Sequence, residues 1–155
     1  ADSQVATRWG KITDFKNFDL ITPNEKEARF SLADQDSSIS VLTRELVKKT
    51  NFKNLILKLG ERGLVSMVSS GLQTKAINLP SFANKVVDST GTGDALLAYA
   101  TLSLLSTKSL VIASILGSIA AACACENDGN IAVSPENIIQ KLNSLENSMN
   151  YKVQK

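Results

Sequence analysis

A run of 16 residues without a charged side chain, Leu110–Cys125, constrains this chain more than any other segment. It falls short of the ~20 residues that a helix needs to cross a bilayer. It is also rich in Ala, Ser and Gly, which suit close packing between elements. We therefore expect a helix from Ser109 to Glu126 with both faces covered inside a globular domain, and no membrane partner.

The rest of the chain alternates short apolar runs with segments that show helical spacing and capping residues. The expected strands are Phe18–Thr22, Leu55–Leu59, Gly63–Val68 and Lys75–Leu79, with a short extended stretch at Val86–Val87. The other expected helices are Glu25–Leu32 after an Asn24 N-cap, Ile39–Thr50, Gly93–Leu105, and Ser134–Leu145 with Ser134 as N-cap. This alternation predicts an α/β domain with a mostly parallel sheet flanked by helices.

Composition excludes several classes of function. The chain has no His, so neither Ser-His-Asp catalysis nor a His-ligated zinc site can be built from it. The net charge is only +2 and aromatic residues make up 5%, which argues against nucleic-acid binding. Cys123 and Cys125 stand two residues apart on the expected helix, so we expect buried, unpaired thiols in a reducing cytoplasm. Residues 1–18 lack the apolar core of a secretory signal.

The segment Asp88–Asp94, with the sequence Asp-Ser-Thr-Gly-Thr-Gly-Asp, has the features of a phosphate-binding loop at a helix start. Gly91 and Gly93 lack Cβ, so the backbone can approach a ligand closely. Successive N–H groups and the positive end of the helix dipole then favour an anion there. Asp94 is either a general base for a substrate hydroxyl or a first-turn partner of the dipole. The loop is neither Gly-x-Gly-x-x-Gly nor a Walker sequence.

Residues 87–95 closely resemble the Asp-x-x-Gly-Ala-Gly-Asp signature of ribokinase-like (PfkB) carbohydrate kinases, with Thr92 in place of the usual Ala. Three other stretches resemble family motifs in the same order. They are Thr22–Ala28, similar to the Asn-x-x-Glu motif; Leu57–Gly63, similar to the strand-turn-strand beside the nucleotide; and Ala120–Asn130, similar to the helix end and Gly turn beside adenine.

The resemblance implies ATP and Mg²⁺ as cofactors and a role for each matching residue. Asp94 would be the base, with Gly91, Thr92 and Gly93 as the anion hole. Asn24 and Glu27 would act on Mg²⁺ through water, and Lys58, Gly60 and Gly63 would border the nucleotide, with Asn127 and Gly129 beside adenine. Asp88 and Thr90 would help to hold a monovalent cation such as K⁺. The residues alone leave other interpretations open: Asn24 as a simple N-cap, Glu27 as a dipole partner, Lys58 as a solvated charge and Asn127 as a helix stop.

Family members are roughly twice as long as this chain. We therefore expect residues 1–155 to be the C-terminal, nucleotide-binding portion of a ribokinase-like domain, inactive in isolation. The substrate would be a sugar or sugar phosphate, and Asp2-Ser3-Gln4 with Thr22-Pro23-Asn24 resembles the heptose-phosphate kinases, which include forms with a nucleotidyltransferase domain. A homodimer is left open. The alternative is a non-catalytic nucleotide-binding or oligomerisation module with the same fold.

Overall fold

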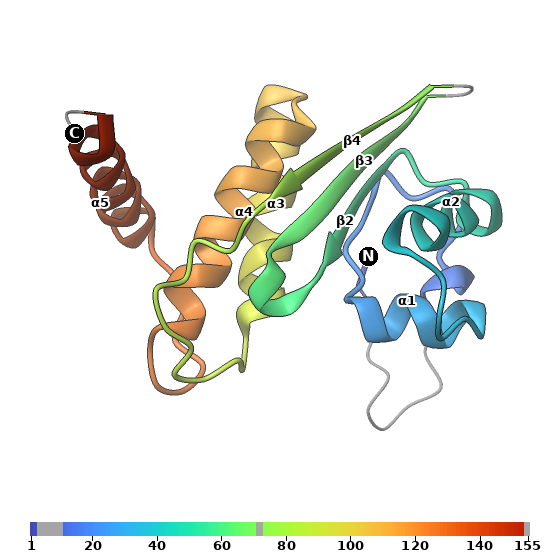
Figure 1. Cartoon of the computed structure of the whole chain (residues 1–155), viewed down its shortest axis with the longest axis horizontal. Coiled ribbons are helices and arrows are strands. Elements are labelled where there is room, and N and C mark those ends of the chain that lie inside the picture. Colours follow the sequence, from blue (N-terminus) through green and yellow to red (C-terminus); the bar gives the residue numbers. More distant parts are fainter. Residues whose placement is uncertain (3–10, 71–72, 154–155) are drawn as a thin grey trace.

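The computed structural model describes residues 1–2, 11–70 and 73–153, so Ser3 and Gln4 lie outside the described residues. A four-stranded sheet separates two groups of helices (Figure 1). The strands are β1 (Leu20–Ile21), β2 (Asn54–Lys58), β3 (Leu64–Ser70) and β4 (Gln73–Leu79). The α-helices are α1 (Glu25–Leu32), α2 (Ile39–Thr50), α3 (Thr92–Thr107), α4 (Leu110–Cys125) and α5 (Pro135–Val153), and the short 3₁₀ helices are η1 (Ile12–Asp14) and η2 (Gly60–Arg62).

The described sheet is mixed rather than mostly parallel, which corrects one expectation. Strand β1 pairs with β2 in parallel, whereas the β2–β3 and β3–β4 pairs are antiparallel. The reason is the length of the connections. A parallel pair needs a long crossover, which α1 and α2 provide between β1 and β2. The three-residue η2 turn between β2 and β3 leaves only the antiparallel arrangement.

Strand β1 is shorter than expected, although pairing continues on both sides of it. The carbonyls of Phe18 and Asp19 accept hydrogen bonds from the backbone of residues 53 and 54, and Lys58 N donates to Pro23 O at 2.9 Å. On the outer side, Ala1 N donates to Leu20 O at 2.6 Å, and Thr22 N donates to Ala1 O at 2.9 Å. This is the pattern of a parallel neighbour, so Ala1 extends the sheet beyond β1.

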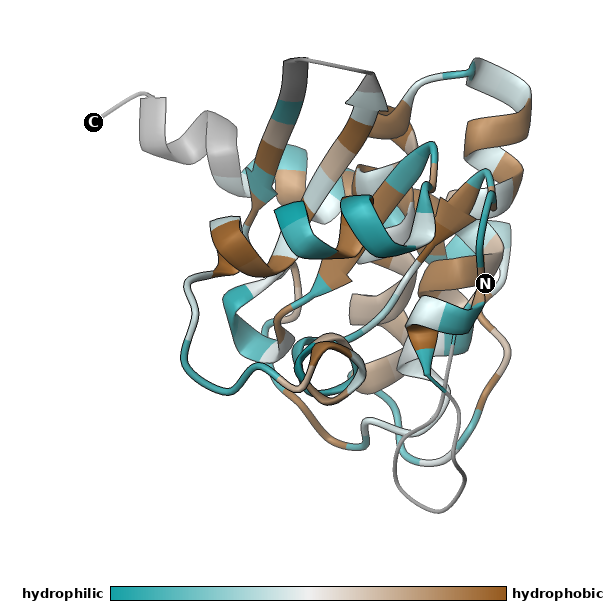
Figure 2. Cartoon of the chain, turned by 90° about the vertical axis from the view of Figure 1, so that its right-hand side faces the viewer, coloured by the Kyte–Doolittle hydropathy of each residue, from teal (hydrophilic) through white to brown (hydrophobic). Residues whose placement is uncertain are grey.

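Alternate side chains of β2 reach opposite faces of the sheet, as a strand requires. Leu55 and Leu57 join a core beneath α1 and α2, where Leu42, Leu46 and Phe52 are also buried. Ile56 points into a second core against α3 and α4, with Leu96 and Ala100. Figure 2 shows the hydrophobic segments gathered in the middle of the molecule and hydrophilic residues on the helices facing the viewer.

Helix α4 packs closely on α3 through small residues. A Cβ at Gly117 would stand 3.1 Å from the Ala100 Cβ and 3.1 Å from Leu96 O, so glycine allows the two helices to approach. The expectation that α4 is covered all round is wrong for its first turn, where Val111 and Ile112 are 43% and 41% exposed. None of the helices in the described part of the chain is both long and apolar enough to cross a membrane.

Three further expectations have clear outcomes. Cys123 and Cys125 are buried free thiols, as expected from their spacing on α4. Helix α5 begins at Pro135 after Ser134, as expected, but continues to Val153 rather than ending near Leu145. Val86 and Val87 form no strand and are about half exposed, at 55% and 48%. Val87 N instead donates to Cys125 O, which ties this segment to the end of α4.

Candidate functional site

Helix α3 starts with backbone donors that no side chain caps. Gly91 occupies the N-cap position with φ 75°, in the left-handed region, and makes no side-chain cap hydrogen bond. The conformation therefore requires glycine, and a Cβ at Gly91, 2.1 Å from Asn130 Oδ1, would also displace the exposed Asn130 side chain. The N-terminus of α3 therefore has donors that no side chain caps and the positive end of the helix dipole, which are features that an anion site needs; Thr92 N donates to Ser89 O at 3.3 Å.

Asp88 and Thr90 form a compact turn just before Gly91. Asp88 Oδ1 accepts hydrogen bonds from Thr90 N at 2.9 Å and from Thr90 Oγ1 at 2.8 Å. These two donors, followed by the Gly129 N–H, hold the pKa of the Asp88 carboxyl below its usual value. The structure thus brings Asp88 and Thr90 beside the glycine turn at Gly129, although the two segments are about 40 residues apart in the chain.

Asn24 and Glu27 form a reciprocal capping box at the start of α1. Glu27 N donates to Asn24 Oδ1 at 2.8 Å, and Asn24 N donates to Glu27 Oε2 at 2.7 Å. Glu27 is only 6% exposed. Burial raises the pKa of its carboxyl, the Asn24 hydrogen bond and the Lys58 charge lower it, and the Asp2 charge raises it further. Asn24 therefore acts as the N-cap of α1, which is the structural role that the sequence left open for it.

These groups suit an indirect contact with Mg²⁺ better than a direct cage. Asn24 Oδ1 and Glu27 Oε2 each already accept a hydrogen bond in the capping box. Each of these oxygens would therefore bind a metal ion directly less strongly than an unoccupied oxygen would. Among the described residues there is no group of three or more His, Cys, Asp or Glu side chains that could hold a metal ion. A hydrated Mg²⁺, which keeps most of its own water ligands, fits such a sparse set of oxygens.

Lys58 stands at the end of β2 and reaches the start of α3. Its Nζ lies 3.1 Å from the position that a Cβ would take at Gly93. The Lys58 ammonium also forms an ion pair with Asp2, 2.8 Å from Nζ to Oδ2, with the two side chains 17% and 23% exposed. Lys58 is therefore not a solvated strand-end charge, which was the alternative that the sequence left open.

A cavity of about 290 Å³ opens beside these residues, between the η2 turn and helices α3 and α4. Its lining is mostly apolar and includes Leu64, Leu96 and Cys125. Of the residues expected to border a nucleotide, it contains Lys58, Gly60 and Gly63, together with Thr92 of the expected anion hole. A cavity of this size and character, with a few polar groups at one end, is typical of small-molecule sites.

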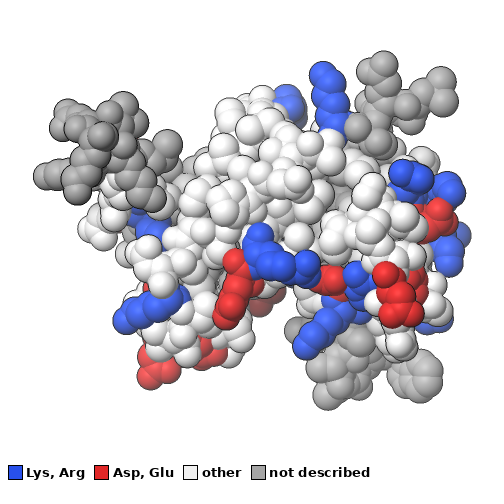
Figure 3. All heavy atoms as spheres, in the orientation of Figure 1, with Lys and Arg blue, Asp and Glu red and all other residues white. Residues whose placement is uncertain are grey.

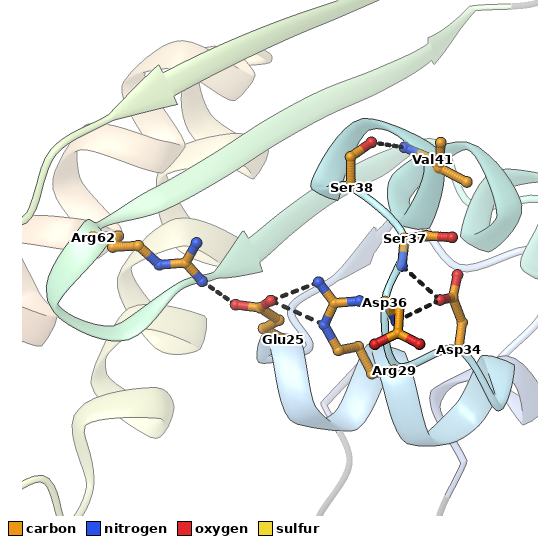
Figure 4. Close-up of polar contacts among 8 residues, drawn as sticks. All are labelled: Glu25, Arg29, Asp34, Asp36, Ser37, Ser38, Val41 and Arg62. Carbon is orange, nitrogen blue, oxygen red and sulfur yellow. Dashed lines mark hydrogen bonds and ion pairs between the residues drawn. The ribbon is translucent and has the colours of Figure 1, made fainter.

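The η2 turn that borders this cavity is held to helix α1 by an ion pair. Arg62 in the turn contacts Glu25 at the start of α1, as Figure 4 shows. Glu25 Oε1 also accepts hydrogen bonds from Arg29 Nε at 2.9 Å and Nη2 at 2.8 Å. Gly63, with φ 87°, closes the turn where a Cβ would overlap Leu79 O at 2.1 Å. The position of the turn is thus fixed from both sides.

Other expected site residues lie apart from the cavity. Asp94 is exposed in the first turn of α3, next to Gly93. Asn127 does not line the cavity; its Nδ2 donates to Cys123 O at 2.7 Å and so caps the end of α4. Gly129 lies in the same turn with φ 77° and open space around it. The helix-stop interpretation of Asn127 is therefore realised in the structure.

Two residues of the site were not identified from the sequence. Asn130 packs on Gly91, and Asp2 pairs with Lys58. Asp2 reaches Lys58 because Ala1 pairs in parallel beside β1, and the carboxyl ends of parallel strands meet at one edge of a sheet.

Figure 3 shows basic and acidic side chains interleaved along the lower edge of the face in view, without an extended patch of either sign.

Comparison with known proteins agrees with this arrangement. The family model described as "pfkB family carbohydrate kinase" matches residues 3–137. The bifunctional protein HldE of Helicobacter pylori strain J99 is 32% identical over 132 residues, which are 83% of this chain and 28% of that protein. The chain thus spans less than a third of the length of such curated relatives.

Solved structures show the same fold. Arabidopsis thaliana ribokinase, in complex with ribose and ATP, superposes with a TM-score of 0.70 at 24% identity, covering 80% of this chain and 40% of that one. Escherichia coli phosphofructokinase-2, in complex with potassium, gives a TM-score of 0.74 at 22% identity, covering 86% and 43%. The expected ribokinase-like α/β fold is confirmed, and the chain belongs to the pfkB family of carbohydrate kinases.

Proposed function

We propose that this chain supplies the nucleotide-binding and catalytic groups for ATP-dependent phosphorylation of a hydroxyl on a sugar or sugar phosphate. The observation that carries the proposal is the meeting of three features at the start of α3. No side chain caps this helix start, the Lys58 ammonium lies against Gly93, and both Lys58 and Thr92 line the cavity of about 290 Å³. An anion with an attached apolar group fits this combination.

Asp94 is proposed as the general base. Its carboxylate follows Gly93 directly and is exposed, so an acceptor hydroxyl can reach it. A carboxylate at this position accepts the proton of the hydroxyl as the oxygen attacks phosphorus. The N–H groups of Gly91, Thr92 and Gly93 would then stabilise the charge on the transferring phosphoryl group, with Thr92 N turning from its 3.3 Å hydrogen bond to Ser89 O.

ATP is assigned to the cavity, with its base against the apolar lining and its phosphates toward Lys58 and Gly93. Gly60 and Gly63 border it because their turn forms the opposite wall. Asn24 and Glu27 would hold hydrated Mg²⁺, which neutralises phosphate charge when bound. The turn of Asp88 and Thr90 beside Gly129 is the proposed place for a monovalent cation. ATP and potassium are named for the ribokinase and phosphofructokinase-2 neighbours respectively.

The sugar acceptor is proposed from similarity rather than from the described site. The matches to bifunctional HldE proteins agree with the resemblance of Asp2 and Thr22-Pro23-Asn24 to heptose-phosphate kinases. A phosphorylated seven-carbon sugar is therefore the first acceptor to examine, followed by ribose and fructose phosphates.

The test combines binding and transfer on the full-length protein. Calorimetry with Mg-ATP should give saturable binding, and ³¹P spectra with the acceptor panel should show ADP and a new phosphate ester for at least one sugar. No binding at millimolar nucleotide would favour an oligomerisation module with this fold. Binding without transfer to any acceptor would favour a non-catalytic nucleotide-binding module.

A further inference from the structure

The ion pair between Asp2 and Lys58 joins two segments 56 residues apart at the proposed phosphate site. Ala1 extends the sheet in parallel beside β1, through the hydrogen bonds of its N and O to Leu20 and Thr22. That register places Asp2 at the same edge of the sheet as the end of β2. The contact therefore follows from topology rather than from a chance meeting of surface side chains.

The position of the pair connects it to the start of α3. A Cβ at Gly93 would stand 3.1 Å from Lys58 Nζ and 3.6 Å from Asp2 Oδ2. Both charged groups therefore lie against Gly93, the last residue of the proposed anion hole. Both side chains are mostly buried, with 17% and 23% of their surfaces exposed, so solvent screens their attraction less than it screens an exposed pair.

We propose that Asp2 is a positioning residue that holds the Lys58 ammonium against Gly93, so that Lys58 is already in place for the transferring phosphoryl group. An ammonium has three donors, so Lys58 can keep Asp2 while it also binds a phosphate oxygen. Without Asp2, the long and flexible lysine side chain would adopt several rotamers, and fewer molecules would have the donor at the reaction site. This inference rests on the proposed function.

The proposal predicts separate effects on binding and on transfer. Asp2→Asn removes a negative charge near the nucleotide phosphates, so the KM for Mg-ATP should stay the same or fall. Lys58 is then no longer held, so kcat should fall about tenfold or more. Asp2→Glu should recover part of the rate, since the carboxylate is retained. Asp19→Asn is the matched control, because it breaks an exposed ion pair with Lys53 away from the site and should leave kcat unchanged.

A double-mutant cycle in the full-length protein decides between this role and others. In a Lys58→Met background, Asp2→Asn should have no further effect on kcat, because the group that it positions is gone. An equal loss of kcat in both backgrounds would overturn the proposal. So would a raised Mg²⁺ requirement of Asp2→Asn in both backgrounds, since Asp2 would then act on the metal.

The result stays separable from the proposed function itself. Phosphoryl transfer by the unmodified protein tests that function without reference to Asp2. If the unmodified protein transfers to no acceptor, the proposed function fails and the positioning role fails with it. If the unmodified protein transfers but the cycle on kcat is additive, only the positioning role is overturned.

Discussion

Gly91 combines two constraints that can be separated by substitution. Its φ of 75° is strained for any residue with a Cβ, and the new atom would meet Asn130 Oδ1. Gly129, with φ 77° and no atom within 4 Å of the place that a Cβ would take, carries the first constraint alone. Comparing substitutions at Gly91 and at Gly129 therefore separates the cost of backbone strain from the cost of lost packing between the loop before α3 and the turn after α4.

We expect Gly129→Ala to lower the free energy of unfolding by about 1–2 kcal/mol, the usual cost of a left-handed non-glycine residue. Gly91→Ala should cost somewhat more, about 2–3 kcal/mol, because the exposed Asn130 side chain must also move away from the new Cβ. Urea unfolding measures both. The double variant Gly91→Ala/Asn130→Ala should recover part of the difference. Equal losses for the two single variants would show that Asn130 does not pack closely on Gly91.

At the scale of elements, helix α1 joins structure and function in one capping box. Asn24 and Glu27 satisfy each other's backbone donors, and Glu27 is nearly buried. Burial raises the pKa of the Glu27 carboxyl above its ordinary value of 4.5. The folded state then binds this proton more tightly than the unfolded state. The stabilisation is therefore complete below the ordinary pKa and is lost as the pH rises through the raised value.

Glu27→Gln keeps an oxygen to accept from Asn24 N but cannot ionise. The unmodified protein loses stability as this carboxyl ionises, and the variant does not. The free energy of unfolding of Glu27→Gln should therefore increase relative to that of the unmodified protein as the pH rises from about 4 to about 7. Urea unfolding of both proteins across that interval measures the difference. A difference that stays constant with pH would mean that burial does not disfavour the charged carboxylate. Asp19→Asn, at an exposed ion pair, serves as a control for general charge effects.

The elements also show what sequence could and could not predict. Helix starts followed from local chemistry: Asn24, Ser134 and Pro135 mark them in both sequence and structure, whereas the end of α5 at Val153 did not follow. The direction of each strand could not be predicted from local chemistry, because it depends on the length of each connection and on which strand becomes the neighbour. The η2 turn determines the antiparallel order of β2 and β3. A periodic pattern of apolar residues carries no information about direction.

In the candidate site, too, local features could be predicted from the sequence and long-range contacts could not. The Asp88–Asp94 loop could be located from its glycines, since the left-handed conformation that Gly91 adopts is a local requirement. The partners of that loop are not local. Lys58 and Asp2 reach Gly93 only through sheet register, and Asn130 reaches Gly91 only through the turn after α4. Lys58 was identified by resemblance, whereas Asp2 and Asn130 were found only in three dimensions.

On the scale of the whole molecule, one end of the sheet collects the charged groups and the uncapped helix start, and the cavity lies beside them. Cores on both faces of the sheet hold this end in place, with β2 contributing to each. Functional groups from segments far apart in the chain therefore meet at one place. The site depends on the complete fold, which is why variants of Asp94 must be examined in the full-length protein.

Asp94 is proposed to accept the proton of the acceptor hydroxyl during phosphoryl transfer. The most direct measurement compares Asp94→Asn with the unmodified full-length protein, using the acceptor that the panel identifies. Calorimetry should give a Kd for Mg-ATP within a few-fold of the original, while the single-turnover rate of transfer falls by about 10²–10⁴, the usual contribution of a general base. Transfer by Asp94→Asn at an undiminished rate would contradict the account.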